Sequence, residues 1–104
     1  MPQASYAGAD VEVDGEGFLV DATAWNEDIG RAIAEQAGIT LTEDHWKVIN
    51  FARTDFRERG QSPGPRRITS ATGVPTKSLY QLFPKGPGKL VAKIAGVPKP
   101  KTCL

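Results

Sequence analysis

Apolar residues recur at helical spacing in two stretches in the central part of the chain. The first stretch follows Thr23, a residue type that caps helices, and continues to about Ala37, just before a glycine. The second lies between Thr42 and Gly60 and has two acidic residues in its first turn, where they favour the positive end of a helix dipole. The apolar faces comprise Trp25, Ile29, Ala32, Ile33 and Ala37 in the first stretch and His45 or Trp46, Ile49, Ala52 and Phe56 in the second. Both stretches are therefore predicted to be amphipathic helices.

The N-terminal part of the chain has a shorter, alternating pattern. Residues 11–13 alternate, residues 14–17 are turn formers and residues 18–20 are apolar, which together predict a small β-hairpin. Residues 1–9 are small and polar without a period, and we expect a disordered tail there. Because an isolated hairpin is marginally stable, this one must pack against the helices.

The remainder of the chain is divided by glycine and proline into short helical segments and an arm. The predicted helices are 66–72, 76–83 and 89–95. Residues 97–104 contain two prolines that prevent a helix, so we expect an extended, projecting C-terminal arm that carries Cys103. The predicted fold is mostly α (α+β): a small helical bundle over residues 10–96 with an N-terminal β-hairpin and a flexible arm. A chain of 104 residues with a 39% hydrophobic share is enough for one such domain.

Charge is distributed unevenly along the chain. The first 59 residues contain all twelve acidic residues and five Arg or Lys, a formal balance of −7, whereas the remainder contains eight Arg or Lys and no acid. A basic C-terminal half is typical of a surface for nucleic acid or an acidic protein, but the two halves can equally attract each other within the fold. The charge pattern leaves both interpretations open.

The chain has one cysteine, Cys103, and one histidine, too few for an internal disulfide or a zinc site built from these residues. We therefore expect neither a metal nor a cofactor. An exposed thiol is a hazard unless it is used, and Lys99 and Lys101 favour its thiolate whereas the carboxylate of Leu104 opposes it. The N-terminus lacks a basic cluster followed by an apolar stretch, and no apolar run could span a bilayer, so we expect a cytoplasmic protein.

Two other interpretations of these residues receive less support. The predicted helices across residues 66–83 could form a DNA-reading helix-turn-helix, but the second contains mostly core residues such as Leu79 and Phe83. The pair of His45 and Cys103 could form a catalytic dyad. A single histidine beside an apolar face is more often a core or capping residue.

Several segments of the chain closely resemble the DsrC/TusE family of sulfur-transfer proteins. The matching segments are Leu79–Lys89, Lys93–Pro100 with Cys103, Glu16–Leu19 with Trp25, Leu41–Trp46, and Ser62-Pro63 followed by Arg66. The resemblance covers roughly residues 10–104, and its C-terminal motif is far more specific than a lone thiol.

The resemblance implies that Cys103 accepts sulfane sulfur as a persulfide from a donor complex of the TusBCD or DsrEFH type. TusE-like members pass the sulfur to a tRNA thiouridylase, whereas DsrC-like members work with dissimilatory sulfite reductase and use a second cysteine eleven positions before the last. That position is Ala92 here, so an internal disulfide cycle cannot run within the chain. TusE-like transfer is favoured.

The function predicted from the sequence is therefore that of a sulfurtransferase-type persulfide carrier, rather than a stand-alone enzyme, in tRNA wobble-uridine 2-thiolation. Lys99, Lys101 and Arg66 are predicted to steer an anionic persulfide or an acidic partner surface. A DsrC-like carrier in dissimilatory sulfur metabolism and a basic nucleic-acid-binding adaptor are the alternatives. The residues themselves leave open the donor, the acceptor, the oligomeric state and any direct contact with tRNA.

Overall fold

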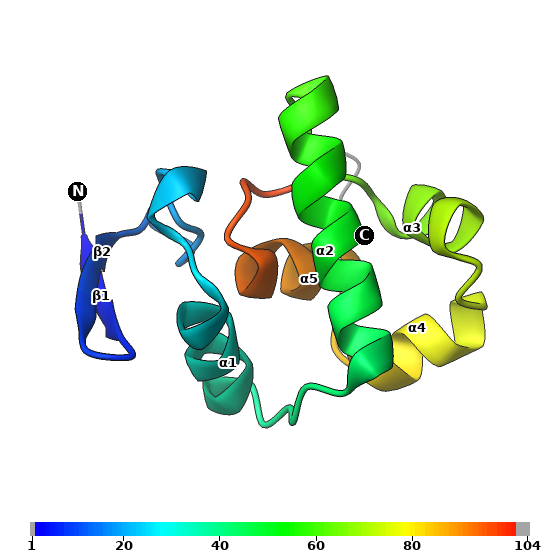
Figure 1. Ribbon diagram of the computed structural model, residues 1–104, viewed down its shortest axis with the longest axis horizontal. Helices are drawn as coiled ribbons and strands as arrows, with labels where there is room; N and C mark the ends of the chain where they lie inside the picture. The colour runs from blue at the N-terminus through cyan, green and yellow to red at the C-terminus, as the bar shows by residue number, and fades with distance from the viewer. Residues whose placement is uncertain (1, 102–104) are drawn as a thin grey trace.

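The computed structural model describes residues 2–101, which form a helical body with a two-stranded sheet at one end (Figure 1). The strands β1 and β2 are followed by a short 3-10 helix, η1, and then by five α-helices. Their bounds are β1 Gln3–Tyr6, β2 Ala9–Glu12, η1 Ala22–Ala24, α1 Glu27–Gln36, α2 Glu43–Arg59, α3 Pro65–Thr72, α4 Thr76–Leu82 and α5 Pro87–Ala95. The predicted α+β class, with a small helical bundle and an N-terminal hairpin, is confirmed.

The longest helix, α2, packs against α5 on one side and α3 on another, and α1 also packs against α5 (Figure 1). The limits of α2 agree with the sequence prediction: Thr42 precedes this helix, and Gly60 ends it in the left-handed conformation with φ of 73°. The largest side chains that are almost completely buried come from nearly every helix and from the loop after β2. They include Phe18, Ile29, Ile49, Ile68, Leu79, Phe83 and Ile94. Burial of this apolar surface is the main stabilising contribution.

The paired strands lie earlier in the chain than the sequence predicted. β1 pairs antiparallel with β2, from Gln3 opposite Glu12 to Tyr6 opposite Ala9. The expectation that residues 1–9 are a disordered tail is therefore wrong for the described residues. Ala7 and Gly8 both have positive φ, as a two-residue hairpin turn requires, although alanine seldom adopts it. The predicted pairing of residues 11–13 with 18–20 is reduced to the isolated bridge between Val13 and Leu19.

The first predicted helix begins later than expected because two capping residues divide the segment. Asp21 accepts a hydrogen bond from the Thr23 amide at the start of η1. Asn26 then caps α1 by accepting from the Ile29 amide at 2.9 Å. Trp25 consequently lies between the two helices instead of on the apolar face of one.

The three short C-terminal helices are confirmed: α4 begins at Thr76 as predicted, whereas α3 and α5 begin one and two residues earlier, each at a proline. Both α3 and α5 have a proline in the first turn, where its missing N–H costs no helical hydrogen bond. In the described part of the chain, no helix is both long and apolar enough to cross a membrane.

Candidate functional site: the base of the C-terminal arm and a cationic cleft

The C-terminal arm leaves α5 at Gly96, which lies directly against the indole of Trp25. An added Cβ at Gly96 would be 2.3 Å from Trp25 Cδ1, and one at Gly30 of α1 would be 2.8 Å from Trp25 Cζ2. Trp25 Nε1 donates a hydrogen bond to the Ile94 carbonyl at 2.8 Å. The indole is therefore fixed between two glycines, and it joins α1 to the end of α5.

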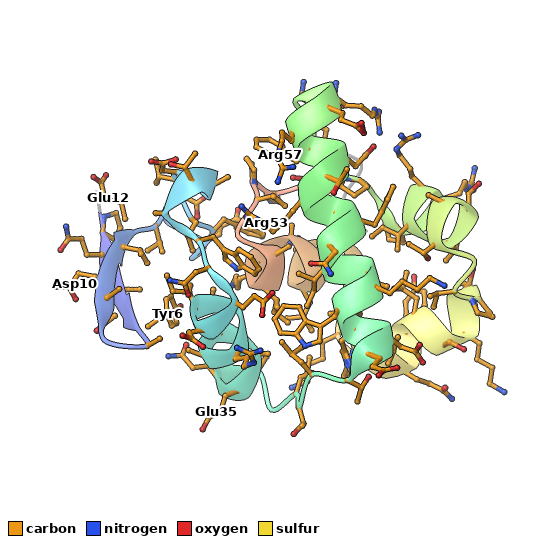
Figure 2. The ribbon with its side chains drawn as sticks, viewed as in Figure 1. Tyr6, Asp10, Glu12, Glu35, Arg53 and Arg57 are labelled. Carbon is orange, nitrogen blue, oxygen red and sulfur yellow. The ribbon has the colours of Figure 1, made fainter. Side chains whose placement is uncertain are left out.

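Arg53 of α2 completes the base of the arm. Its guanidinium donates to the Ala95 carbonyl at 2.8 Å and to the Ala22 carbonyl at 3.2 Å. The same group lies 4.2 Å from the centre of the Trp25 ring, a cation–π contact. Figure 2 shows Arg53 pointing from α2 toward the segments before α1 and after α5. Burial, with a smaller contribution from Arg57, lowers the pKa of Arg53 from its ordinary value.

Beyond Gly96, the described part of the arm follows the protein surface. Val97 is buried and donates from its amide to the Ala92 carbonyl at 3.0 Å, and Pro100 is buried as well. Ser62, in the loop after α2, donates its hydroxyl to the Pro98 carbonyl. The segment is non-helical, as predicted, but residues 97–101 pack against the body rather than project from it.

The arm leads to an open cleft of about 840 Å³ beside the C-terminal end of α2. The wall of the cleft is made by the loop after α2, by α3 and by the exposed face of α4. Cationic side chains from three parts of the chain line it: Arg59, Arg66, Arg67 and Lys101. Tyr80 of α4, with 49% of its surface exposed, adds an aromatic ring. None of the described residues that line this cleft is acidic.

Asp55 of α2 holds two of these cations in place. Arg67 donates to both of its carboxylate oxygens, at 2.7 and 2.9 Å, and Arg59 donates to one of them at 3.1 Å. The hydrogen bonds from Arg67, followed by those from Arg59, lower the pKa of Asp55 although burial opposes them. The two ion pairs hold both guanidinium groups beside the cleft. Their shared carboxylate is shielded from solvent, because the Asp55 side chain is only 4% exposed.

The structure brings together two of the three cations that the sequence analysis selected. Arg66 and Lys101 both line the cleft, and Arg66 makes no hydrogen bond or ion pair with its side chain among the described residues. Lys99 does not line it and instead forms an ion pair with Glu16 at 3.1 Å. Cys103 lies outside the described residues.

His45 has a structural role. It is buried at the start of α2, with Nδ1 facing the Thr42 amide and hydroxyl and Nε2 2.9 Å from the Leu82 carbonyl. Since a carbonyl can only accept, Nε2 carries the proton and Nδ1 accepts. Both nitrogens are thus occupied, which agrees with the expected capping or core role.

Sequence reasoning did not identify Arg53, Ser62 or Tyr80 as functional candidates. Nothing in the local pattern distinguishes Arg53 from other helix-surface arginines, because its partners lie 31 and 42 residues away. Among residues 2–101 there is no cluster of three His, Cys, Asp or Glu side chains that could hold a metal ion.

The fold and the arm path define a small helical protein with a C-terminal arm held against its body. A family model described as "DsrC like protein" matches residues 5–104, and the chain belongs to this family. The curated relatives include "Sulfurtransferase TusE" of Pectobacterium atrosepticum, 42% identical over 95% of this chain and 97% of that protein. The protein of the same name from Escherichia coli K12 is 39% identical over the same shares of the two chains.

Solved structures of similar proteins have the same fold. The NMR structure of Allochromatium vinosum DsrC superimposes with a TM-score of 0.86 at 36% identity, over 98% of this chain and 97% of that one. The oxidized gamma-subunit of the dissimilatory sulfite reductase (DsrC) from Archaeoglobus fulgidus also gives 0.86, at 33% identity over 99% of this chain and 100% of that one.

Proposed function

We propose that this chain is a sulfur-relay carrier that accepts sulfane sulfur on Cys103 and passes it on for 2-thiolation of the wobble uridine of tRNA. The observation that carries the proposal is the similarity, over nearly the whole length of both chains, to proteins named sulfurtransferase. Cys103 is the only cysteine in the sequence and hence the only thiol that could take part.

The proposed transfer is a thiol exchange in which no external oxidant or reductant is needed. The Cys103 thiolate attacks the outer sulfur of a donor persulfide, the donor S–S bond breaks, and the donor leaves as a thiolate. The transferred sulfur keeps its oxidation state as a persulfide on Cys103. An acceptor thiolate then attacks that outer sulfur in the same manner and regenerates the Cys103 thiolate.

Position 92 favours this one-thiol relay over a disulfide cycle. Ala92 lies in α5, is 1% exposed and has its carbonyl bonded to the Val97 amide at the start of the arm. A second thiol is therefore absent at the position where, by family resemblance, DsrC-like members use one. The proposed partners are a donor complex of the TusBCD or DsrEFH type and a tRNA thiouridylase as acceptor.

Mass spectrometry after incubation with a donor persulfide tests the first step. Wild type is expected to gain the mass of one sulfur atom, and Cys103→Ala is expected to gain none. Equal gain in both proteins would contradict the proposal. The second step is tested by adding the thiouridylase and tRNA and detecting thiolated RNA by its retardation in a mercury-containing gel, with Cys103→Ala as the matched control.

The fold similarity to the gamma-subunit of a dissimilatory sulfite reductase supports a second candidate, a DsrC-like partner of such an enzyme. That function predicts copurification with a siroheme protein. Thiolation of tRNA without such copurification would decide for the relay.

A further inference from the structure

We propose that the cationic cleft binds RNA directly, so that the carrier contacts the tRNA acceptor as well as the protein partner. The inference deepens the proposed function and rests on it for the choice of tRNA. The site itself is defined by Arg66, Lys101 and Tyr80. Of these, Tyr80 has no part in the proposed sulfur chemistry on Cys103.

Charge is the first observation that supports RNA. Four cationic side chains line the cleft, namely Arg59, Arg66, Arg67 and Lys101. Of the acidic residues near them, Asp55 is shielded by its two arginines, while Glu58 is exposed and acts on Arg67. The remaining cationic side chains line a hollow surface, which suits a phosphate backbone.

The chemistry of the cleft walls is the second observation. Gln61, Ser70 and Thr76 supply amide and hydroxyl donors that can hydrogen-bond phosphate and ribose oxygens. The hydroxyls of Ser62 and Thr69 already donate to the carbonyls of Pro98 and Arg66, and their oxygens can accept from ribose hydroxyls. Tyr80 is one of only two large hydrophobic residues that are exposed in the described chain, the other being Val20. An exposed ring beside cations is the arrangement on which an unpaired base stacks.

An acidic protein is the competing partner for a basic cleft, but the same lining favours it less. Protein interfaces are centred on buried apolar or aromatic anchors, and the cleft offers Tyr80 as its only exposed large hydrophobic residue among those described. Mixed cations, hydroxyls and a single ring fit a nucleotide chain better than an apolar side-chain cluster.

The position of the cleft suits delivery of sulfur. Lys101 lines it, and this residue lies two positions before Cys103 in the sequence. An RNA segment bound in the cleft would contact Lys101, the last described residue of the arm.

The test measures fluorescence anisotropy of a labelled tRNA anticodon stem-loop with the full chain carrying Cys103→Ala, at several salt concentrations between about 50 and 200 mM. We expect saturable binding with a Kd of about 1–100 μM, in the range of sequence-independent binding. Adding Arg66→Ala or Lys101→Ala should weaken binding severalfold. It should also reduce the slope of the logarithm of the binding constant against the logarithm of the salt concentration by about 0.7 for each lost phosphate contact. Adding Tyr80→Leu should weaken it about fivefold or more with little change in slope.

The matched control is Lys89→Ala, which removes one exposed charge from the same basic half but lies outside the cleft. It should change the Kd by less than about twofold, because it touches no proposed contact. Equal weakening by Lys89→Ala and Arg66→Ala would overturn the proposal in favour of a diffuse field. Equal affinity for a glutamate-rich peptide of the same charge would overturn it in favour of an acidic protein partner, and absence of saturable RNA binding would overturn it outright.

Failure of this inference can be distinguished from failure of the proposed function. Sulfur loading of Cys103 in Tyr80→Leu is measured by mass spectrometry and should remain at the wild-type level, because Tyr80 has no part in the proposed sulfur transfer. If RNA binding fails while loading persists, the cleft assignment is wrong and the relay stands. If wild type itself gains no sulfur on Cys103 while RNA binding persists, the relay is wrong and the RNA site stands.

Discussion

Replacement of Gly96 by alanine tests whether Trp25 fixes the base of the arm. Gly96 has φ of 71°, and the left-handed conformation costs a residue with a Cβ about 1–2 kcal/mol. The new Cβ would also lie 2.3, 2.6 and 2.8 Å from Trp25 Cδ1, Cγ and Cβ. The indole cannot shift without losing its hydrogen bond to Ile94 and its contact with Arg53. Overpacking of this kind adds about 1–3 kcal/mol, so we expect a total loss of about 2–5 kcal/mol in the free energy of unfolding.

Gly73 offers a matched control for this prediction. It also ends a helix, with φ of 77°, but an added Cβ there would have no atom within 4 Å. Gly73→Ala should therefore cost only the conformational part, about 1–2 kcal/mol. Urea unfolding of both variants measures the difference, which we expect to be about 1–3 kcal/mol. A difference below about 0.5 kcal/mol would refute the assigned clash, as would failure of Trp25→Leu to reduce the penalty of Gly96→Ala in a double-mutant cycle.

Two further substitutions test the contacts around the site. Asp55→Asn should lower the free energy of unfolding at pH 7 by about 1–3 kcal/mol, since it removes charge-assisted hydrogen bonds to Arg67 and Arg59. Because the pKa of Asp55 is lowered by folding, its contribution is present above the unfolded value of about 3.9 and is lost as the pH falls through the folded value. Urea midpoints should thus converge for wild type and variant as the pH falls from about 5 toward 2, and a constant gap would contradict this. Arg53→Ala should lower the free energy of unfolding by about 1–3 kcal/mol, measured by thermal or urea unfolding, because two carbonyls lose their donor. Arg57→Ala, one helical turn away, should lower it by less than about 0.5 kcal/mol. Equal losses in the two variants would contradict the role assigned to Arg53.

The fold could be predicted best where local signals and packing agree. The helix from Glu43 to Arg59 is bounded by Thr42 and Gly60, residues that favour a helix start and a left-handed end, and both limits were predicted. The N-terminal hairpin was misplaced because its turn uses Ala7 at positive φ, which the sequence gives no reason to expect. Contacts of β1 with α1 and the buried side chain of Tyr6 outweigh this unfavourable turn.

The candidate site could be predicted only in part, because its members are distant in the sequence. Arg66 and Lys101 were selected as cations, but their meeting at one cleft depends on the path of the arm over the Ser62 loop. Lys99 was selected with them, yet its ion pair with Glu16 spans 83 residues and no local pattern reveals it. Arg53 was missed for the same reason. Periodicity identifies faces of helices but not which distant backbone carbonyls a side chain will reach.

The position of Trp25 gives the molecule an intrinsic optical reporter. Its indole is hydrogen-bonded to the end of α5, stacked beneath Arg53 and in contact with Gly96, where the arm begins. Detachment of the arm base would change the solvation of this ring and hence its emission maximum. Trp46, the second tryptophan, lies under Arg31 on α1 and its contacts lie elsewhere, so a chain with Trp46→Phe would emit from the arm base alone. Opening of that junction could then be followed in real time on the unlabelled protein as a donor or acceptor is added.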